Sequence, residues 1–143
     1  MHQETRNRVQ ILQKRMLETD IRRAVFTDES SIGYLTGIGG YLGIEFGRPT
    51  MLVIDSETPP SVITPLMESE MVGAMTWVDD IRVWEDIGRR NWGRVLGEVL
   101  GDSPSEIWIE RNHLPAIVRN YLEENYPDVQ LSDISPVLVP YAL

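Results

Sequence analysis

The sequence predicts an α/β sandwich whose sheet is in part parallel. Two amphipathic helical patterns, at residues 92–100 and 114–122, each stand between short β-prone runs. Apolar residues recur in both patterns at the i, i+3, i+4 spacing that places them on one helix face. Residues 50–55 are almost continuously apolar, which is typical of a strand covered on both faces. Strands that alternate with helices in this way favour parallel pairing through crossover connections.

The remaining elements are predicted from local patterns. Residues 30–37 read as one or two helical turns, with Ser30 or Ser31 as the cap and Gly37 as the stop. In chain order, the other expected elements are a helix at 3–19, a strand at 22–27, a strand at 61–64, a helix from Pro65 to about residue 75, a strand or two short pieces at 76–84, strands at 106–110 and 129–131, and a proline-broken tail at 134–143.

A glycine-rich stretch at residues 30–50 is the most distinctive part of the chain, because it holds six of the eleven glycines. Such clusters occur where the backbone bends sharply or approaches another segment closely, and rings and charges set among them are typical of a binding rim. The alternative is a wide, glycine-kinked hairpin with exposed rings.

Phe46 and Arg48 are the binding candidates within this stretch. Two residues apart in extended backbone, they would share one face, where the guanidinium fork matches a carboxylate. The alternative is a surface arginine that covers an aromatic ring.

Composition limits the classes of partner. The chain has 143 residues, a formal net charge of −9 and no cysteine. It is large enough for one domain with a core that needs no disulfides. The negative charge disfavours nucleic acid as a partner, and the best basic patch, Arg89, Arg90 and Arg94, is small. No apolar run approaches the roughly 20 residues of a membrane span. We therefore expect a cytoplasmic protein with neither nucleic acid nor a membrane as a partner.

The sequence lacks the residues that several familiar catalytic motifs require. His2 and His113 have no partner at metal-ligand spacing, and there is no cysteine or GxSxG elbow to supply a nucleophile. Leu42 stands where GxGxxG needs a glycine, and Lys14, the only lysine, has no phosphate-loop context.

Acidic residues at predicted strand ends leave one enzymatic alternative open. Carboxylates at the ends of neighbouring strands can hold two metal ions for phosphodiester cleavage. The same residues are ordinary turn formers and helix caps, and we favour that interpretation because a basic substrate track is missing. The residues concerned are Asp28, Glu29, Asp55, Asp79, Asp80 and Glu110.

The segment SSIGYLTGIGG, followed by FGRPTMLVID, resembles the N-terminal domain of the creatinase, prolidase and aminopeptidase P family, the "pita-bread" metallohydrolases. The YLTG turn at residues 34–37 and the order of elements over nearly the whole chain carry this resemblance. It implies a three-layer α/β/α sandwich with a mixed sheet of about five to six strands and a ribonuclease H-like motif. It also implies a domain at residues 1–135, with 136–143 as the start of a linker to a catalytic domain.

In such a family the metal ligands belong to the catalytic domain. The resemblance therefore implies no catalytic residue, metal or cofactor in this segment, and a divalent metal pair (Mn, Co or Zn) in the catalytic domain. The implied partners are that domain, a second copy in a homodimer, and a small amino-acid-like or Xaa-Pro peptide substrate. Phe46 and Arg48 match the FGR segment with which creatinase-type members bind a substrate carboxylate across the dimer, so they are the expected substrate-binding residues.

Three functions follow from these observations. The first is a non-catalytic N-terminal domain of a dimeric creatinase- or Xaa-Pro peptidase-like hydrolase, which serves dimerisation and shapes the substrate pocket of the partner subunit. The second is a freestanding α/β module that binds a small molecule or a protein. The third is the metal-dependent nuclease with an acidic cluster.

Overall fold

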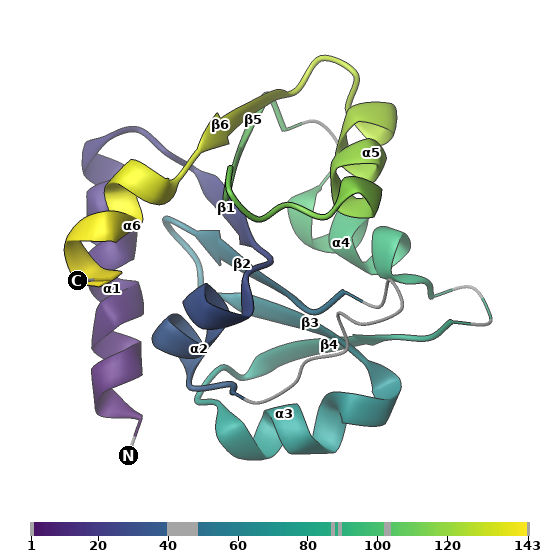
Figure 1. Ribbon diagram of the computed structural model, residues 1–143, viewed down its shortest axis with the longest axis horizontal. Helices are drawn as coiled ribbons and strands as arrows, with labels where there is room; N and C mark the ends of the chain where they lie inside the picture. The colour runs from purple at the N-terminus through teal and green to yellow at the C-terminus, as the bar shows by residue number, and fades with distance from the viewer. Residues whose placement is uncertain (1, 40–48, 87, 89, 102–103, 143) are drawn as a thin grey trace.

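A six-stranded sheet lies between two layers of helices in the computed structural model, which describes residues 2–39, 49–86, 88, 90–101 and 104–142 (Figure 1). The strand order is β4-β3-β2-β1-β5-β6. In chain order the elements are α1 (Gln3–Glu18), β1 (Arg23–Phe26), α2 (Glu29–Thr36), β2 (Met51–Asp55), β3 (Ser61–Pro65), the 3-10 helix η2 (Leu66–Glu68), α3 (Ser69–Met75), β4 (Asp80–Trp84), α4 (Trp92–Leu100), β5 (Glu106–Ile109), α5 (Ala116–Asn125), β6 (Gln130–Asp133) and α6 (Ser135–Ala142).

The sheet is mixed, and only β2 runs against the other strands. β1 pairs in parallel with β5, β5 with β6, and β3 with β4, whereas β2 is antiparallel to both β1 and β3. The sheet therefore has a carboxyl end, where five strands finish and β2 starts. At the opposite amino end, five strands start and β2 finishes.

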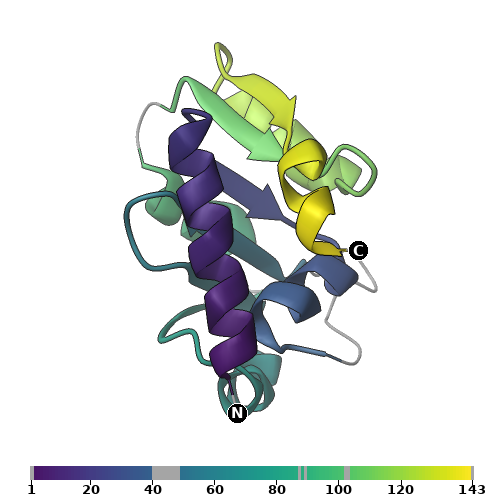
Figure 2. The same cartoon turned by 90° about the vertical axis from the view of Figure 1, so that its left-hand side faces the viewer.

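Each face of the sheet has its own apolar core, because successive strand residues point to opposite faces. In β1, Ala24 and Phe26 pack toward α1, α2, α3 and α6, while Val25 packs toward α4 and α5. Figure 2 shows α1, α6 and α2 together over the first face. The three-layer α/β/α architecture with a mixed sheet is thus confirmed. None of the described helices combines the length and the apolar character that crossing a membrane requires.

Caps explain where the short helices begin and end. Asp28 caps α2 by accepting a hydrogen bond from the Ser30 backbone N–H at 3.1 Å, so the cap is Asp28 and neither Ser30 nor Ser31. Gly37 ends α2 in the left-handed conformation, with φ of 86°, as the sequence predicts. Asn91 caps α4 in the same manner as Asp28, through the Arg94 backbone N–H.

Two prolines that fall within the predicted helical segments, from Pro65 and at 114–122, lie just outside the helices. Pro65 is the last residue of β3, and Pro115 immediately precedes α5. Both have ψ near 140°, which is extended backbone. Of the run at 76–84, only β4, from Asp80 onward, is a strand.

The expectation of a proline-broken tail is wrong, because residues 135–142 form α6. Asp133, the last residue of β6, accepts hydrogen bonds from both the backbone N–H and the hydroxyl of Ser135 and so starts the helix. Pro136 stands in the first turn, where its missing N–H removes no helical hydrogen bond. Ile134 and Leu138 are buried in the core beside α1.

Candidate functional site

The expected substrate-binding residues, Phe46 and Arg48, lie outside the described residues, so that prediction stays untested. The segment that contains them, residues 40–48, connects α2 to β2. Because β2 is the reversed strand, its first residue, Met51, lies at the carboxyl end of the sheet.

The described residues on both sides of this segment are firmly held. Before it, Ile38 is fully buried and its N–H donates to the Thr36 hydroxyl at 3.2 Å. After it, the Pro49 carbonyl accepts a hydrogen bond from Nε1 of the buried Trp84 at 3.0 Å, and Thr50 is fully buried. The backbone is therefore fixed within two residues of Arg48 on its C-terminal side.

Glu110 is a buried acidic side chain at the carboxyl end that accepts three hydrogen bonds. It follows β5 directly and is only 6% exposed. Its Oε1 accepts the backbone N–H groups of Thr27 at 2.9 Å and Asp28 at 3.0 Å, and its Oε2 accepts the Ser31 hydroxyl. Burial raises the pKa of Glu110, although these hydrogen bonds oppose the rise. The carboxylate thus ties β5 to the end of β1 and to the first turn of α2.

His113 interacts with Thr27, the residue whose backbone N–H also donates to Glu110. The Thr27 hydroxyl donates to the His113 carbonyl, and His113 Nδ1 lies 3.3 Å from the same hydroxyl oxygen. Because that hydroxyl proton is already used, Nδ1 must be the donor in this pair. Within the described ranges, no group of three or more His, Asp or Glu side chains could hold a metal ion.

The strand-end acids divide between the two ends of the sheet. Asp28 and Glu110 lie at the carboxyl end, whereas Asp55 and Asp80 lie at the amino end, at the finish of β2 and the start of β4. Each of these four carboxylates accepts hydrogen bonds from nearby groups, in caps, turns or ion pairs. The geometry therefore does not bring them together as the nuclease hypothesis requires.

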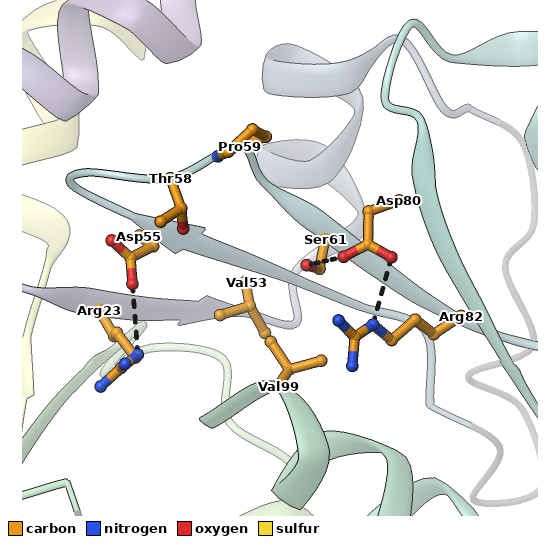
Figure 3. A pocket seen from close by; sticks show the side chains of 9 residues that line it. All are labelled: Arg23, Val53, Asp55, Thr58, Pro59, Ser61, Asp80, Arg82 and Val99. Carbon is orange, nitrogen blue, oxygen red and sulfur yellow. Dashed lines mark hydrogen bonds and ion pairs between the residues drawn. The ribbon is translucent and has the colours of Figure 1, made fainter. Parts of the chain in front are cut away.

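A concave site opens at the amino end, on the face covered by α4 (Figure 3). Its volume is about 330 Å³. Nine residues line it: Arg23, Val53, Asp55, Thr58, Pro59, Ser61, Asp80, Arg82 and Val99. We call it the amino-end pocket.

Charged side chains in the amino-end pocket are paired. Arg82 Nε lies 3.2 Å from Asp80 Oδ1, and Asp80 Oδ2 accepts the Ser61 hydroxyl at 2.6 Å. Partial burial alone would raise the pKa of Asp80, but the hydrogen bonds from Ser61 and Arg82 and the charge of Arg82 outweigh it, so the pKa is lowered. On the opposite side, Arg23 Nε lies 3.4 Å from Asp55 Oδ2.

The predicted basic patch is partly neutralised. Arg90 makes two hydrogen bonds to the Glu98 carboxylate, at 3.0 and 3.1 Å. Arg94 lies at the start of α4, and Arg89 is outside the described residues. The Glu98 carboxylate thus offsets the positive charge of Arg90.

Comparison with known families decides the classification. The model of the Creatinase/Prolidase N-terminal domain matches residues 8–140. The chain belongs to this family.

Solved structures of creatinase/prolidase N-terminal domains share the fold. The domain of an X-Pro dipeptidase from Streptococcus pyogenes has a TM-score of 0.79 and 17% identity, over 94% of this chain and 98% of that one. A prolidase from Thermococcus sibiricus has a TM-score of 0.81 and 17% identity, and the match covers 99% of this chain and 37% of the prolidase. The dipeptidase PepE from Mycobacterium ulcerans has a TM-score of 0.79 and 19% identity, and the match covers 96% of this chain and 36% of the dipeptidase. This chain thus spans about a third of the length of the two longer proteins.

Within this creatinase/prolidase N-terminal domain, sequence reasoning missed the two arginines of the amino-end pocket. Asp55 and Asp80 were candidates only as strand-end acids. The spacing of Asp80 and Arg82 in a β-prone run was the available signal, because alternate strand residues share one face. Arg23 gave no comparable signal, since its partner Asp55 is 32 positions away in the chain.

Proposed function

We propose that the chain is the non-catalytic N-terminal domain of a dimeric Xaa-Pro peptidase- or creatinase-like hydrolase. Its role is to support dimerisation and to shape the substrate pocket of the partner subunit. The family match over residues 8–140 is the observation that carries this proposal. The prolidase from Thermococcus sibiricus and the dipeptidase from Mycobacterium ulcerans support it, because a domain of this fold makes up about a third of each protein.

Arg48 is the proposed contact to the substrate carboxylate, with Phe46 beside it. Ligands of open α/β sheets bind outside the carboxyl ends of the strands, and residues 40–48 connect to β2 at that end. The hydrogen bond from Trp84 to the Pro49 carbonyl supports this role, because it holds the backbone next to Arg48. A rigid anchor lowers the entropy that a binding side chain loses on meeting its ligand.

Catalysis and metal binding belong, in this proposal, to a separate domain of a cytoplasmic protein. The divalent metal pair (Mn, Co or Zn) would lie there, together with the residues that carry out hydrolysis. The proposed substrates are Xaa-Pro peptides or small amino-acid-like molecules. This domain would then have its own catalytic domain and a second subunit as partners.

Reading the gene beyond the codon for Leu143 and assaying its product tests the proposal. The product is expected to contain a catalytic domain with carboxylate and histidine metal ligands and to hydrolyse an Xaa-Pro dipeptide or creatine in the presence of Mn²⁺. The 143-residue chain alone is expected to hydrolyse neither. A gene that ends at Leu143 would instead favour the freestanding binding module, and turnover by the purified chain alone would contradict the non-catalytic role.

A further inference from the structure

The sheet face toward α4 changes character from one end to the other. Near the carboxyl end it is apolar and buried, with Met51 of β2, Ile63 of β3 and Trp84 of β4. Alternate residues share a face, so the same face continues at the amino end as Asp55, Ser61, Asp80 and Arg82. Charges on an inner sheet face are tolerated where they are paired and the helix layer leaves space. Here that space is the amino-end pocket, of about 330 Å³.

Arg82 offers unused hydrogen-bond donors to the amino-end pocket. Asp80 holds it only through Nε, at 3.2 Å, and the Ser61 hydroxyl fixes the other oxygen of Asp80. The two terminal nitrogens of Arg82 extend toward the side of the pocket formed by Val53 and Val99 (Figure 3). Among the described residues, neither terminal nitrogen has a hydrogen-bond partner.

The opposite side of the amino-end pocket carries a second ion pair. Asp55 accepts from Arg22 Nε at 3.0 Å and lies 3.4 Å from Arg23 Nε. The four charged residues that line the pocket, two aspartates and two arginines, therefore sum to zero formal charge. The hydroxyl-bearing Thr58 and Ser61 and the apolar Pro59 complete the lining on the side of the β2–β3 turn.

This lining defines the chemistry of a ligand. The terminal nitrogens of a guanidinium match the two oxygens of a carboxylate. The aspartates can accept from an ammonium group, and Val53 and Val99 offer apolar contact. A neutral lining in a protein of net charge −9 disfavours phosphate and other multiply charged anions. The volume is near the lower limit of small-molecule pockets, which span roughly 300–1,000 Å³, so the ligand is small.

We propose that the amino-end pocket binds a free α-amino acid with an aliphatic side chain. Its carboxylate lies on the terminal nitrogens of Arg82, its ammonium group on the aspartates, and its side chain on Val53 and Val99. Such binding needs no catalytic domain, and the pocket lies at the opposite end of the sheet from the start of β2. The assignment can therefore fail while the proposed function holds, and the reverse.

Isothermal titration calorimetry of the 143-residue chain with L-leucine tests this assignment. L-leucinamide lacks the carboxylate and N-acetyl-L-leucine lacks the ammonium group, so each is expected to bind about tenfold or more weakly than L-leucine. Inorganic phosphate is expected not to compete. The assignment is overturned if L-leucine does not bind at about 10 mM, if the amide binds equally well, or if phosphate displaces L-leucine.

Substitutions locate the site. Arg82→Ala is expected to weaken L-leucine binding about tenfold or more, and Arg82→Lys to restore only part, because lysine lacks the planar fork. Arg119→Ala, on the exposed surface of α5, is the matched control and should bind L-leucine as the unaltered chain does.

NMR amide shifts in the unaltered chain give a readout that does not depend on whether any variant folds. L-leucine should shift Ser61, Arg82 and Val99, and shifts confined to other regions would overturn the assignment.

Discussion

At the scale of single residues, Glu110 shows how one buried side chain organises the carboxyl end of the sheet. Its carboxylate accepts three hydrogen bonds, and the residue as a whole is 6% exposed. The sequence indicated only an acid at a strand end, which is compatible with a metal ligand or a cap. It could not decide between them, because the backbone partners at Thr27 and Asp28 are 83 and 82 positions away in the chain.

Glu110→Ala is expected to lower the free energy of unfolding by about 1–3 kcal/mol, because it leaves buried backbone donors without an acceptor. Glu110→Gln should keep the fold close to the stability of the unaltered chain. Its amide oxygen can still accept from the two backbone N–H groups, and its amide nitrogen can donate to the Ser31 hydroxyl. Urea titration at neutral pH compares the two variants. An equal loss in both would show that the negative charge, and not the acceptor, holds this end together.

The pH dependence of stability provides a separate check on Glu110. Its pKa in the folded chain is raised above the ordinary value of 4.5. The folded state thus binds the proton more tightly than the unfolded state does, so the contribution of Glu110 to stability is fully present below the unfolded pKa. That contribution is lost as the pH rises through the folded pKa. As the pH rises from about 4 to about 7, the Glu110→Gln variant should therefore become more stable relative to the unaltered chain, as measured by the free energy of unfolding. A constant difference across this range contradicts the assigned burial effect.

At the scale of elements, periodicity located the helices well but misjudged segments that contain proline. The pattern at 92–100 predicts α4 correctly. The tail at 134–143 was misread because Pro136 was treated as a helix breaker. In α6 it occupies the first turn, where a proline costs no hydrogen bond. The decisive contact, between the residues of α6 and α1, joins the two ends of the chain and has no local signature.

Leu96 tests the packing of α4 on the sheet. It is fully buried in the core formed by α4, α5 and the sheet. Leu96→Ala should lower the free energy of unfolding by about 2–5 kcal/mol, through lost apolar burial and the cavity that remains. Leu17→Ala is the matched control, because Leu17 is 55% exposed on α1, and it should change stability by less than about 0.5 kcal/mol. Urea titration measures both, and similar values for the two variants would mean that the core is misplaced.

Gly37 tests the C-terminal cap of α2. Its φ is 86°, and a Cβ there would lie 3.2 Å from the Met75 carbonyl oxygen. Gly37→Ala should therefore lower the free energy of unfolding by about 1–2 kcal/mol or more. Gly39→Ala is the control, since a Cβ at Gly39 would meet no heavy atom of the described residues within 4 Å. Its effect should stay within about 0.5 kcal/mol. Thermal or urea unfolding that ranks the two variants in the opposite order would contradict the assigned cap.

At the scale of the whole molecule, the fold class was predictable and the sites were only partly so. Alternating strands and helices predicted an α/β sandwich, and the YLTG turn carried the family resemblance. The reversal of β2 puts the start of that strand at the carboxyl end of the sheet. The amino-end pocket arises from residues on four strands, the β2–β3 turn and one helix, from Arg23 to Val99. Such a site depends on strand register, which no local pattern in one sequence determines.

The central claim is that this domain supplies a substrate-binding arginine to a hydrolase, and kinetics of Arg48 variants test it most directly. The measurement is kcat/KM in the protein that carries the catalytic domain. A charge-assisted bond of about 1.5–3 kcal/mol predicts that Arg48→Ala lowers kcat/KM by about 10- to 150-fold, mainly through KM. Arg48→Lys should recover only part of the loss, and a substrate analogue without the carboxylate should be insensitive to either change. If kcat/KM of Arg48→Ala stays within about twofold of the unaltered enzyme, Arg48 is a surface residue and the claim is contradicted.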